Sequence, residues 1–372
     1  MSGGHVSGAR AAVLAAGSGA GQARAGQEAP AAGSARLLDP GVLRAVHLDL
    51  LGRPPFAAER AAWAGKPLSA LVDELLAGRE VWEHWIDEQL YYFLLVDNFR
   101  PQSDRVLALP VELYERRIGV REAIHRIALS SSFDQRNPGP DTFVTVVMEQ
   151  LLQLKVQEAT RELELGKGLY DGKPGVFLGQ SGRSQADVVR IAIEAPSFLT
   201  ELLRREHRRL LRADLPPKEL AAAARALEQD PLGYPALLRG WLQGPGFERR
   251  LAEKIVQPNR LYVRTMYVDL LERLPDAEEE RRMRSALDGL SDPGPLRSVL
   301  ARLLLESGSA AAPSKEEIGD PEAWVGGLFE RLLGRPAAAR ELAACASALR
   351  DPACRTTTVV YALVSHPEYQ TY

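Results

Sequence analysis

The segment His47-Leu-Asp-Leu-Leu-Gly-Arg-Pro-Pro55 decides the fold, because its pattern returns three times along the chain. The later copies are His207-Arg-Arg-Leu-Leu-Arg-Ala-Asp-Leu-Pro216, Tyr267-Val-Asp-Leu-Leu-Glu-Arg-Leu-Pro275 and Phe329-Glu-Arg-Leu-Leu-Gly-Arg-Pro336. In every copy a ring residue stands three positions before a Leu-Leu pair. This spacing places the ring and both leucines on one face of a helix.

Each copy also predicts a turn and a second helix. Gly52 and Gly334 follow the leucine pair, where the end of a helix commonly needs a left-handed residue. The proline then prevents the first helix from continuing and can sit in the first turn of the next one. An acidic residue that favours a helix N-terminus follows in all four copies, as Glu59, Glu219, Glu279 and Glu341. The prediction is an all-α array of repeated helix-turn-helix pairs, interrupted by one Gly-rich loop insertion and stacked on one another.

A second pattern follows the pairs. An apolar run ends in a small or polar break, and an aromatic residue comes next, as Trp82, Phe133, Phe198, Phe247 and Tyr369. We expect each aromatic side chain to fold back onto its own helix pair as a hydrophobic plug.

The chain divides into four stretches by these criteria. Residues 1–36 are rich in Ala, Gly and Ser and are expected to be a disordered leader or a weak export signal. Residues 37–133 form the first helical unit. Residues 134–190 are an insertion with an apolar helix from about 143 to 163 and a Gly-rich loop at 166–182. Residues 191–372 hold three further helix-pair repeats.

Composition excludes several classes of protein. The 372 residues carry a net charge of −3 and a pI of about 6.2, so DNA binding is not expected. No apolar run approaches the roughly 20 residues that span a bilayer. We therefore expect a soluble protein, with a cytoplasmic or a periplasmic location both open. Cys345 and Cys354 are too few for a disulfide framework, although a single disulfide between them stays open.

The first unit resembles a known family. The residues that carry the resemblance are His47-Leu-Asp-Leu-Leu-Gly-Arg-Pro-Pro-Phe56, Leu71-Val-Asp-Glu-Leu-Leu-Ala-Gly78 and Trp82-Glu-His-Trp-Ile-Asp87. They are similar to the cytochrome-associated domains of unknown function in large planctomycete-type exported proteins. The later repeats keep only part of this pattern. The chain also lacks the haem-attachment sequence Cys-x-x-Cys-His. The resemblance implies a haem-free accessory to an exported redox system.

Candidate catalytic residues lie between the first unit and the insertion. They are His84, Asp87, His125, Asp134, Asp141 and Asp171. His84 and Glu88 share a helix face, but a second histidine at metal-binding spacing is missing, so no metal and no cofactor is expected. His47 and His207 occupy the ring position of the repeat, which predicts that they pack rather than bind a ligand.

The Gly-rich loop is a candidate binding element through Gly166, Lys167, Tyr170, Lys173 and Gln180. A phosphate-binding P-loop does not fit, because Pro174 follows Lys173 and removes a backbone N–H. A structural hairpin over the helical core is the leading interpretation of this stretch. The basic run at 204–212 is expected to be a solvated helix face.

The function that follows from these patterns is a non-enzymatic binding or scaffold protein whose partner is another protein. A surface polymer or a redox partner stays open. The alternative is an enzyme, such as a metal-dependent hydrolase, with its site between the first unit and the insertion.

Overall fold

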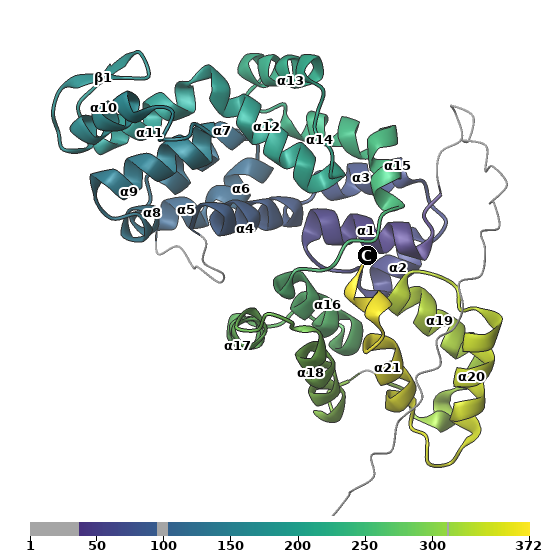
Figure 1. Cartoon of the computed structure of the whole chain (residues 1–372). Coiled ribbons are helices and arrows are strands. Elements are labelled where there is room, and N and C mark those ends of the chain that lie inside the picture. Colours follow the sequence, from purple (N-terminus) through teal and green to yellow (C-terminus); the bar gives the residue numbers. More distant parts are fainter. Residues whose placement is uncertain (1–36, 95–102, 311) are drawn as a thin grey trace, which may run out of the picture. The chain divides into compact units, whose positions relative to one another are not determined.

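The computed structural model describes residues 37–94, 103–310 and 312–372, and these are almost wholly helical (Figure 1). The predicted all-α class is therefore confirmed. The sheet found in the described residues is a hairpin, in which β1 (Gly175–Phe177) pairs antiparallel with β2 (Gln180–Gly182). The expected leader, residues 1–36, lies outside the described part of the chain. Within the described ranges, every helix is too short or too polar to cross a bilayer.

The four ring-and-dileucine segments form the ends of four helices, α1 (Pro40–Leu51), α12 (Pro196–Leu211), α16 (Asn259–Leu271) and α19 (Pro321–Leu333). Their ring residues are at most 6% exposed, which confirms the predicted packing of His47, His207, Tyr267 and Phe329. The cap that follows each helix adopts the left-handed conformation, with φ between 52° and 66°, at Gly52, Arg212, Glu272 and Gly334. The sequence repeat is therefore also a repeat of backbone geometry.

Each repeat contains more than the predicted pair. The second helices are α2 (Ala57–Trp63), α13 (Pro217–Gln229), α17 (Ala277–Asp288) and α20 (Ala339–Arg350). A third helix follows in every repeat, as α3 (Leu68–Leu76), α14 (Tyr234–Leu242), α18 (Gly294–Glu306) and α21 (Thr356–Val364). The plug residues then open α4 (Glu80–Leu94), α15 (Pro245–Leu251) and the 3-10 turn η3 (Pro367–Gln370). All five predicted plugs are buried, which confirms that role.

An arginine in the link clamps three of the four repeats. Arg335 donates to both oxygens of Glu341 at 2.8 Å and also bonds Glu368 in the plug turn. Its guanidinium stacks on the ring of Phe329, 5.3 Å from the centroid. Arg53 with Glu59, and Arg273 with Glu279, repeat this arrangement at the same six-residue spacing. The predicted acidic residue thus stabilises its helix N-terminus and also binds the link.

The insertion is more broken than the sequence predicted. Four short helices precede it, namely α5 (Asp104–Leu107), α6 (Leu109–Tyr114), α7 (Val120–Ala128) and α8 (Ser131–Arg136). The insertion itself contains α9 (Gly139–Val146), the π-helical turn η1 (Val147–Leu151) and α10 (Thr160–Tyr170). The hairpin follows α10 and leads to α11 (Gln185–Glu194). The single helix expected at about 143–163 is therefore wrong. Gly166 lies inside α10 and not in a loop. A Cβ at this position would lie 2.6 Å from Val144 Cγ1 on α9. The lack of a side chain at Gly166 lets α10 approach α9.

The described residues form one compact unit with two hydrophobic cores. The first core runs from Leu38 to Phe247 and combines the first unit, the insertion and the second repeat, so the expected boundaries at 133 and 190 do not separate cores. The second core runs from Tyr262 to Tyr369 and holds the third and fourth repeats.

Buried charges join the two cores through α1. Arg44 donates to both oxygens of Asp269 on α16, at 3.1 and 2.7 Å. Asp49, one and a half turns further along α1, accepts from Arg250 at 2.8 Å and from the hydroxyl of Tyr372 at 3.1 Å. The chain end lies beside α1 as a result (Figure 1).

Substituting alanine at Gly52 should destabilise the protein more than the same change at Gly65. Both glycines have a left-handed φ, of 66° and 69°, so each substitution costs about 1–2 kcal/mol in backbone strain. A Cβ at Gly52 would also lie 2.4 Å from His84 Nδ1, whereas nothing lies within 4 Å of one at Gly65. We expect Gly52→Ala to cost about 2–4 kcal/mol in urea unfolding. Equal costs would contradict this account.

Glu341→Gln should lower the free energy of unfolding by roughly 1 kcal/mol at neutral pH, because the clamp is partly exposed to solvent. Hydrogen bonds from Arg335 lower the pKa of Glu341 from 4.5 to about 2. A depressed folded-state pKa contributes stability above pH 4.5 that is lost as the pH falls towards 2. The difference between wild type and variant should therefore shrink over that window.

The matched control for this clamp is Glu219→Gln. Glu219 occupies the same position in the second repeat, where Ala213 stands in place of the arginine. Its replacement should change the urea midpoint little. If Glu219→Gln lowered the free energy of unfolding as much as Glu341→Gln does, the stabilising role of the arginine clamp would be wrong.

Candidate functional site

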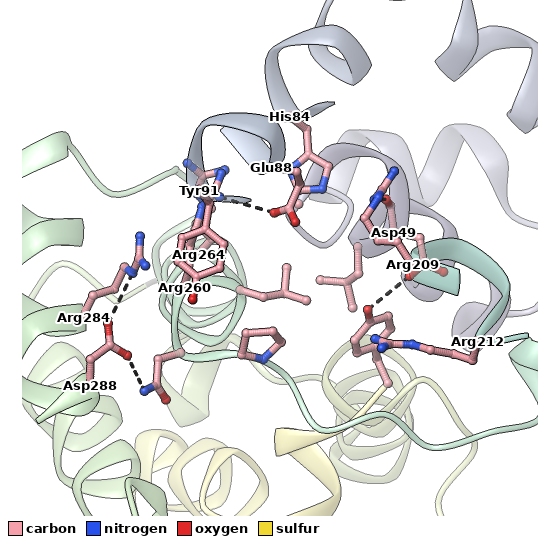
Figure 2. Close-up of a pocket in the computed structure, with 16 residues that line it drawn as sticks. Asp49, His84, Glu88, Tyr91, Arg209, Arg212, Arg260, Arg264, Arg284 and Asp288 are labelled. Atoms are coloured by element: carbon pink, nitrogen blue, oxygen red, sulfur yellow. Dashed lines mark hydrogen bonds and ion pairs between the residues drawn. The ribbon is translucent and has the colours of Figure 1, made fainter. Parts of the chain in front are cut away.

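A cavity of about 220 Å³ lies where the two cores meet, between α1, α4, α12, α16 and α17 (Figure 2). Five arginines line it, namely Arg209, Arg212, Arg260, Arg264 and Arg284, against the three carboxylates Asp49, Glu88 and Asp288. Figure 2 shows Arg209 and Arg212 on one side and the other three arginines opposite. The volume is below the roughly 300–1,000 Å³ of pockets for drug-sized ligands, so it suits a smaller molecule. Three further carboxylates, Asp87, Glu206 and Glu280, bond these arginines from outside the cavity.

The arginines of α16 are held in place by carboxylates behind them. Arg260 donates to Asp87 at 2.8 Å and to Glu88 at 3.3 Å. Arg264 donates to the same oxygen of Asp87 at 3.2 Å and to Glu280 at 3.0 Å. Asp87 therefore orients two arginines of the wall, which is a positioning role.

Arg209 is held in place by the buried carboxylate of Glu206. Glu206 is 1% exposed and accepts hydrogen bonds from Trp85 at 3.2 Å, Gln89 at 3.0 Å and Tyr234 at 2.9 Å. Arg209 donates to it at 3.2 Å. Burial acts to raise the pKa of Glu206, but the neighbouring arginines and these donors outweigh burial and lower it. The carboxylate stays charged, so Arg209 has a permanent partner.

Arg212 differs from the other cations of the wall. It caps α12 with φ 54°, at the position where Gly52 and Gly334 cap their helices. A side chain in that conformation costs about 1–2 kcal/mol relative to glycine. Among the residues that the structure describes, none forms an ion pair or a side-chain hydrogen bond with its guanidinium. Glu272 caps α16 in the same conformation, with φ 52°, and the Arg212 side chain is exposed to solvent.

His84 lies over Gly52 at the centre of the site. Its side chain is buried, and Nδ1 has no hydrogen-bond partner in the described chain. Burial lowers the pKa of His84 well below 6.5, and Arg260, Arg209 and Arg264 lower it further. The imidazole is therefore neutral at physiological pH and lies in a positive potential.

Asp49 adds an acceptor to the wall. Its Oδ1 is bonded by Arg250 and Tyr372, whereas its buried Oδ2 has no partner within the described residues. Burial raises the pKa of Asp49 in spite of Arg250. The cavity can thus bind an anionic group on its arginines and a hydroxyl or amine on Asp49 Oδ2.

The predicted catalytic residues do not come together. His84 and Asp87 lie at this cavity, but His125 pairs with Glu122 on α7, its Nδ1 3.3 Å from the carboxylate. Asp134 accepts from Gln185 at 2.8 Å. The remaining candidates pair within the insertion, Asp141 with Lys167 at 2.7 Å and Asp171 with Lys173 at 3.8 Å. Of these six candidates His84 lines the cavity, Asp87 lies behind its arginines, and the other four form pairs elsewhere.

The predicted loop site is also dispersed. Gly166, Lys167 and Tyr170 belong to α10, so the expected loop at 166–182 starts only after that helix. Lys173 lies in the turn before β1, and Gln180 begins β2, where its side chain accepts from Arg190. The interpretation of this stretch as a structural hairpin is confirmed, because Phe177 on β1 is fully buried.

Sequence reasoning missed the arginines of the cavity. The run at 204–212 was expected to face solvent, yet Arg209 points at the cavity and its side chain is only 24% exposed. Arg260, Arg264 and Arg284 all come from the third repeat, at least 48 residues beyond the end of this run, and meet it only in the folded chain. One signal was available, since Arg212 breaks the glycine pattern of the first and fourth repeats.

Searches against family models, curated proteins and solved structures found no significant match to this chain. The resemblance to the cytochrome-associated domains therefore stays a prediction. Within residues 37–94, 103–310 and 312–372, no three His, Cys, Asp or Glu side chains are arranged to hold a metal ion. Cys345 and Cys354 are both free, half-buried thiols, so the alternative of a disulfide between them is not what the structure contains.

His84 should remain neutral at pH 6, where an ordinary histidine is largely protonated. The unfolded chain takes up a proton at His84 below pH 6.5 and the folded chain does not, so stability falls as the pH drops below 6.5. NMR of the imidazole nitrogens measures this directly. In urea unfolding, His84→Gln should flatten the pH dependence between 7.5 and 5.5. A His84 midpoint at or above 6.5 would show that the cavity is not positive.

Proposed function

We propose that this protein is a non-enzymatic binding protein that holds a small anionic molecule in the arginine-lined cavity. The lining of the cavity carries the proposal, because five arginines from the second and third repeats border one space and Arg212 among them has no ion pair to a described residue. Glycine in the same position of two other repeats shows that the helix end itself does not need the arginine.

The arrangement of the wall supports the same function. Guanidinium groups match carboxylate and phosphate oxygens in a planar, bidentate manner. Asp87 and Glu206 hold three of the arginines before any ligand binds, so little side-chain freedom is lost on binding. A protein partner and a soluble location in the cytoplasm or periplasm, expected from the sequence, remain predictions alongside this one.

Arg212→Gly should separate binding from folding. Glycine relieves the left-handed strain, so the free energy of unfolding should rise by about 0.5–1 kcal/mol after the entropy gained by the unfolded chain is counted. Affinity for the ligand should fall at least about tenfold, because one charge-assisted hydrogen bond is lost. Calorimetric titration with inorganic phosphate and with citrate, paired with urea unfolding, measures both effects.

Arg208→Gln is the matched control. Arg208 lies one turn earlier on α12, is exposed, pairs with Asp214 and does not line the cavity. Its loss should leave anion affinity unchanged. The proposed function is wrong if neither anion binds the wild-type protein saturably, or if Arg212→Gly binds as tightly as wild type.

A further inference from the structure

A second cavity, of about 340 Å³, lies between α1, α2 and α19 and shares no lining residue with the first. Its walls are largely apolar and include Leu38, Pro40, Leu43, Pro55, Ala61 and Ala64. The volume falls at the lower end of the roughly 300–1,000 Å³ that ligand pockets occupy. An apolar cavity with a few polar groups is typical of a site for a small organic molecule.

Arg331 on α19 places a charge in this apolar cavity. Its guanidinium has neither an ion pair nor a side-chain hydrogen bond to any described residue, and its Nε is buried. Burial lowers the pKa of Arg331, and the attraction of Asp269 offsets this effect only in part. The side chain is half-buried and has no counter-ion, so a bound anion would offset part of the cost of taking its charge out of water.

The second repeat shows what Arg331 lacks. Arg209 stands two residues after its ring residue, as Arg331 does after Phe329. Glu206, three residues before Arg209, supplies the partner carboxylate. The residue three before Arg331 is Leu328, which belongs to the second core and cannot pair with a cation. The fourth repeat therefore keeps the arginine and omits its internal counter-ion.

Arg44 lies beside Arg331 and lines the same cavity. It is 5% exposed, and its terminal nitrogens bond Asp269 and the backbone oxygen of Arg331. The Nε atoms of both arginines are buried within the protein and have no partner in the described part of the chain. The terminal nitrogens of Arg331 are accessible, so they are the donors that a ligand in this cavity can reach.

The carboxylates near this cavity do not neutralise Arg331. Asp39 is exposed and caps α1 through the amide of Val42, at 2.8 Å. Glu330 is exposed on α19. Arg60, the third arginine of the lining, is already paired with Glu272 at 2.9 Å.

We propose that this cavity binds a small amphipathic carboxylate, such as a short or medium-chain fatty acid. The carboxylate accepts hydrogen bonds from the terminal nitrogens of Arg331, and the alkyl chain lies along the apolar walls. Charge complementarity selects an anion, and the walls select an apolar tail over a compact inorganic ion. This site is independent of the anion site between the cores.

Octanoate is the probe, with octanol and octylamine as ligands that share the tail and lack the negative charge. Calorimetric titration of the full chain should show saturable binding of octanoate and at least about tenfold weaker binding of the other two. Arg331→Met should weaken octanoate binding by a similar factor and raise the thermal midpoint of the ligand-free protein, because a half-buried charge without a counter-ion is replaced by an apolar side chain. Arg340→Met, at an exposed position on α20, should change neither.

A second pair of variants tests the site without changing a charge. Gly327 lines the cavity and Gly326 does not, and a Cβ at either glycine would meet nothing within 4 Å. Gly327→Leu should fill the cavity and abolish octanoate binding, whereas Gly326→Leu should preserve it. Equal binding of octanoate and octanol would overturn the proposal, as would full binding by Arg331→Met or Gly327→Leu. If Arg331→Met failed to fold, the Gly327→Leu result would decide.

Discussion

The pairing of buried charges across α1 is the interaction on which the rest of the unit depends. Arg44 bonds Asp269 of the second core, and Asp49 bonds Arg250 of the first core and Tyr372 at the chain end. Pairs of this kind add little net stability compared with apolar contacts, but removing one partner costs about 3–5 kcal/mol. These ion pairs therefore contribute mainly by selecting one arrangement of the two cores, and only to a small extent by raising the free energy of unfolding.

Both cavities follow from this arrangement, because α1 is a wall of each. Leu43 and Arg44 face the cavity shared with α2 and α19, and Leu48 and Asp49 face the cavity shared with α4, α12, α16 and α17.

One position of the repeat supplies the charges. The residue two after the ring is Asp49 in the first repeat, Arg209 in the second, Asp269 in the third and Arg331 in the fourth. Each cavity lies where an aspartate repeat meets an arginine repeat. In the second repeat Glu206 pairs Arg209, whereas in the fourth Leu328 stands in the corresponding place before Arg331, at the cavity between the first and fourth repeats.

The sequence by itself determined the helical class, the four ring-and-dileucine helices, their left-handed caps and the buried plugs, because these depend on spacings of a few residues and on local backbone preferences. Only the tertiary structure decided which charges meet. Arg260, Arg264 and Arg284 reach Arg209 and His84 through contacts between repeats far apart in the chain, and the short spacings that define a helix carry no information about such contacts. The break in the helix expected at about 143–163 has the same origin, since packing of α10 on α9 and the hairpin outweighed its apolar periodicity.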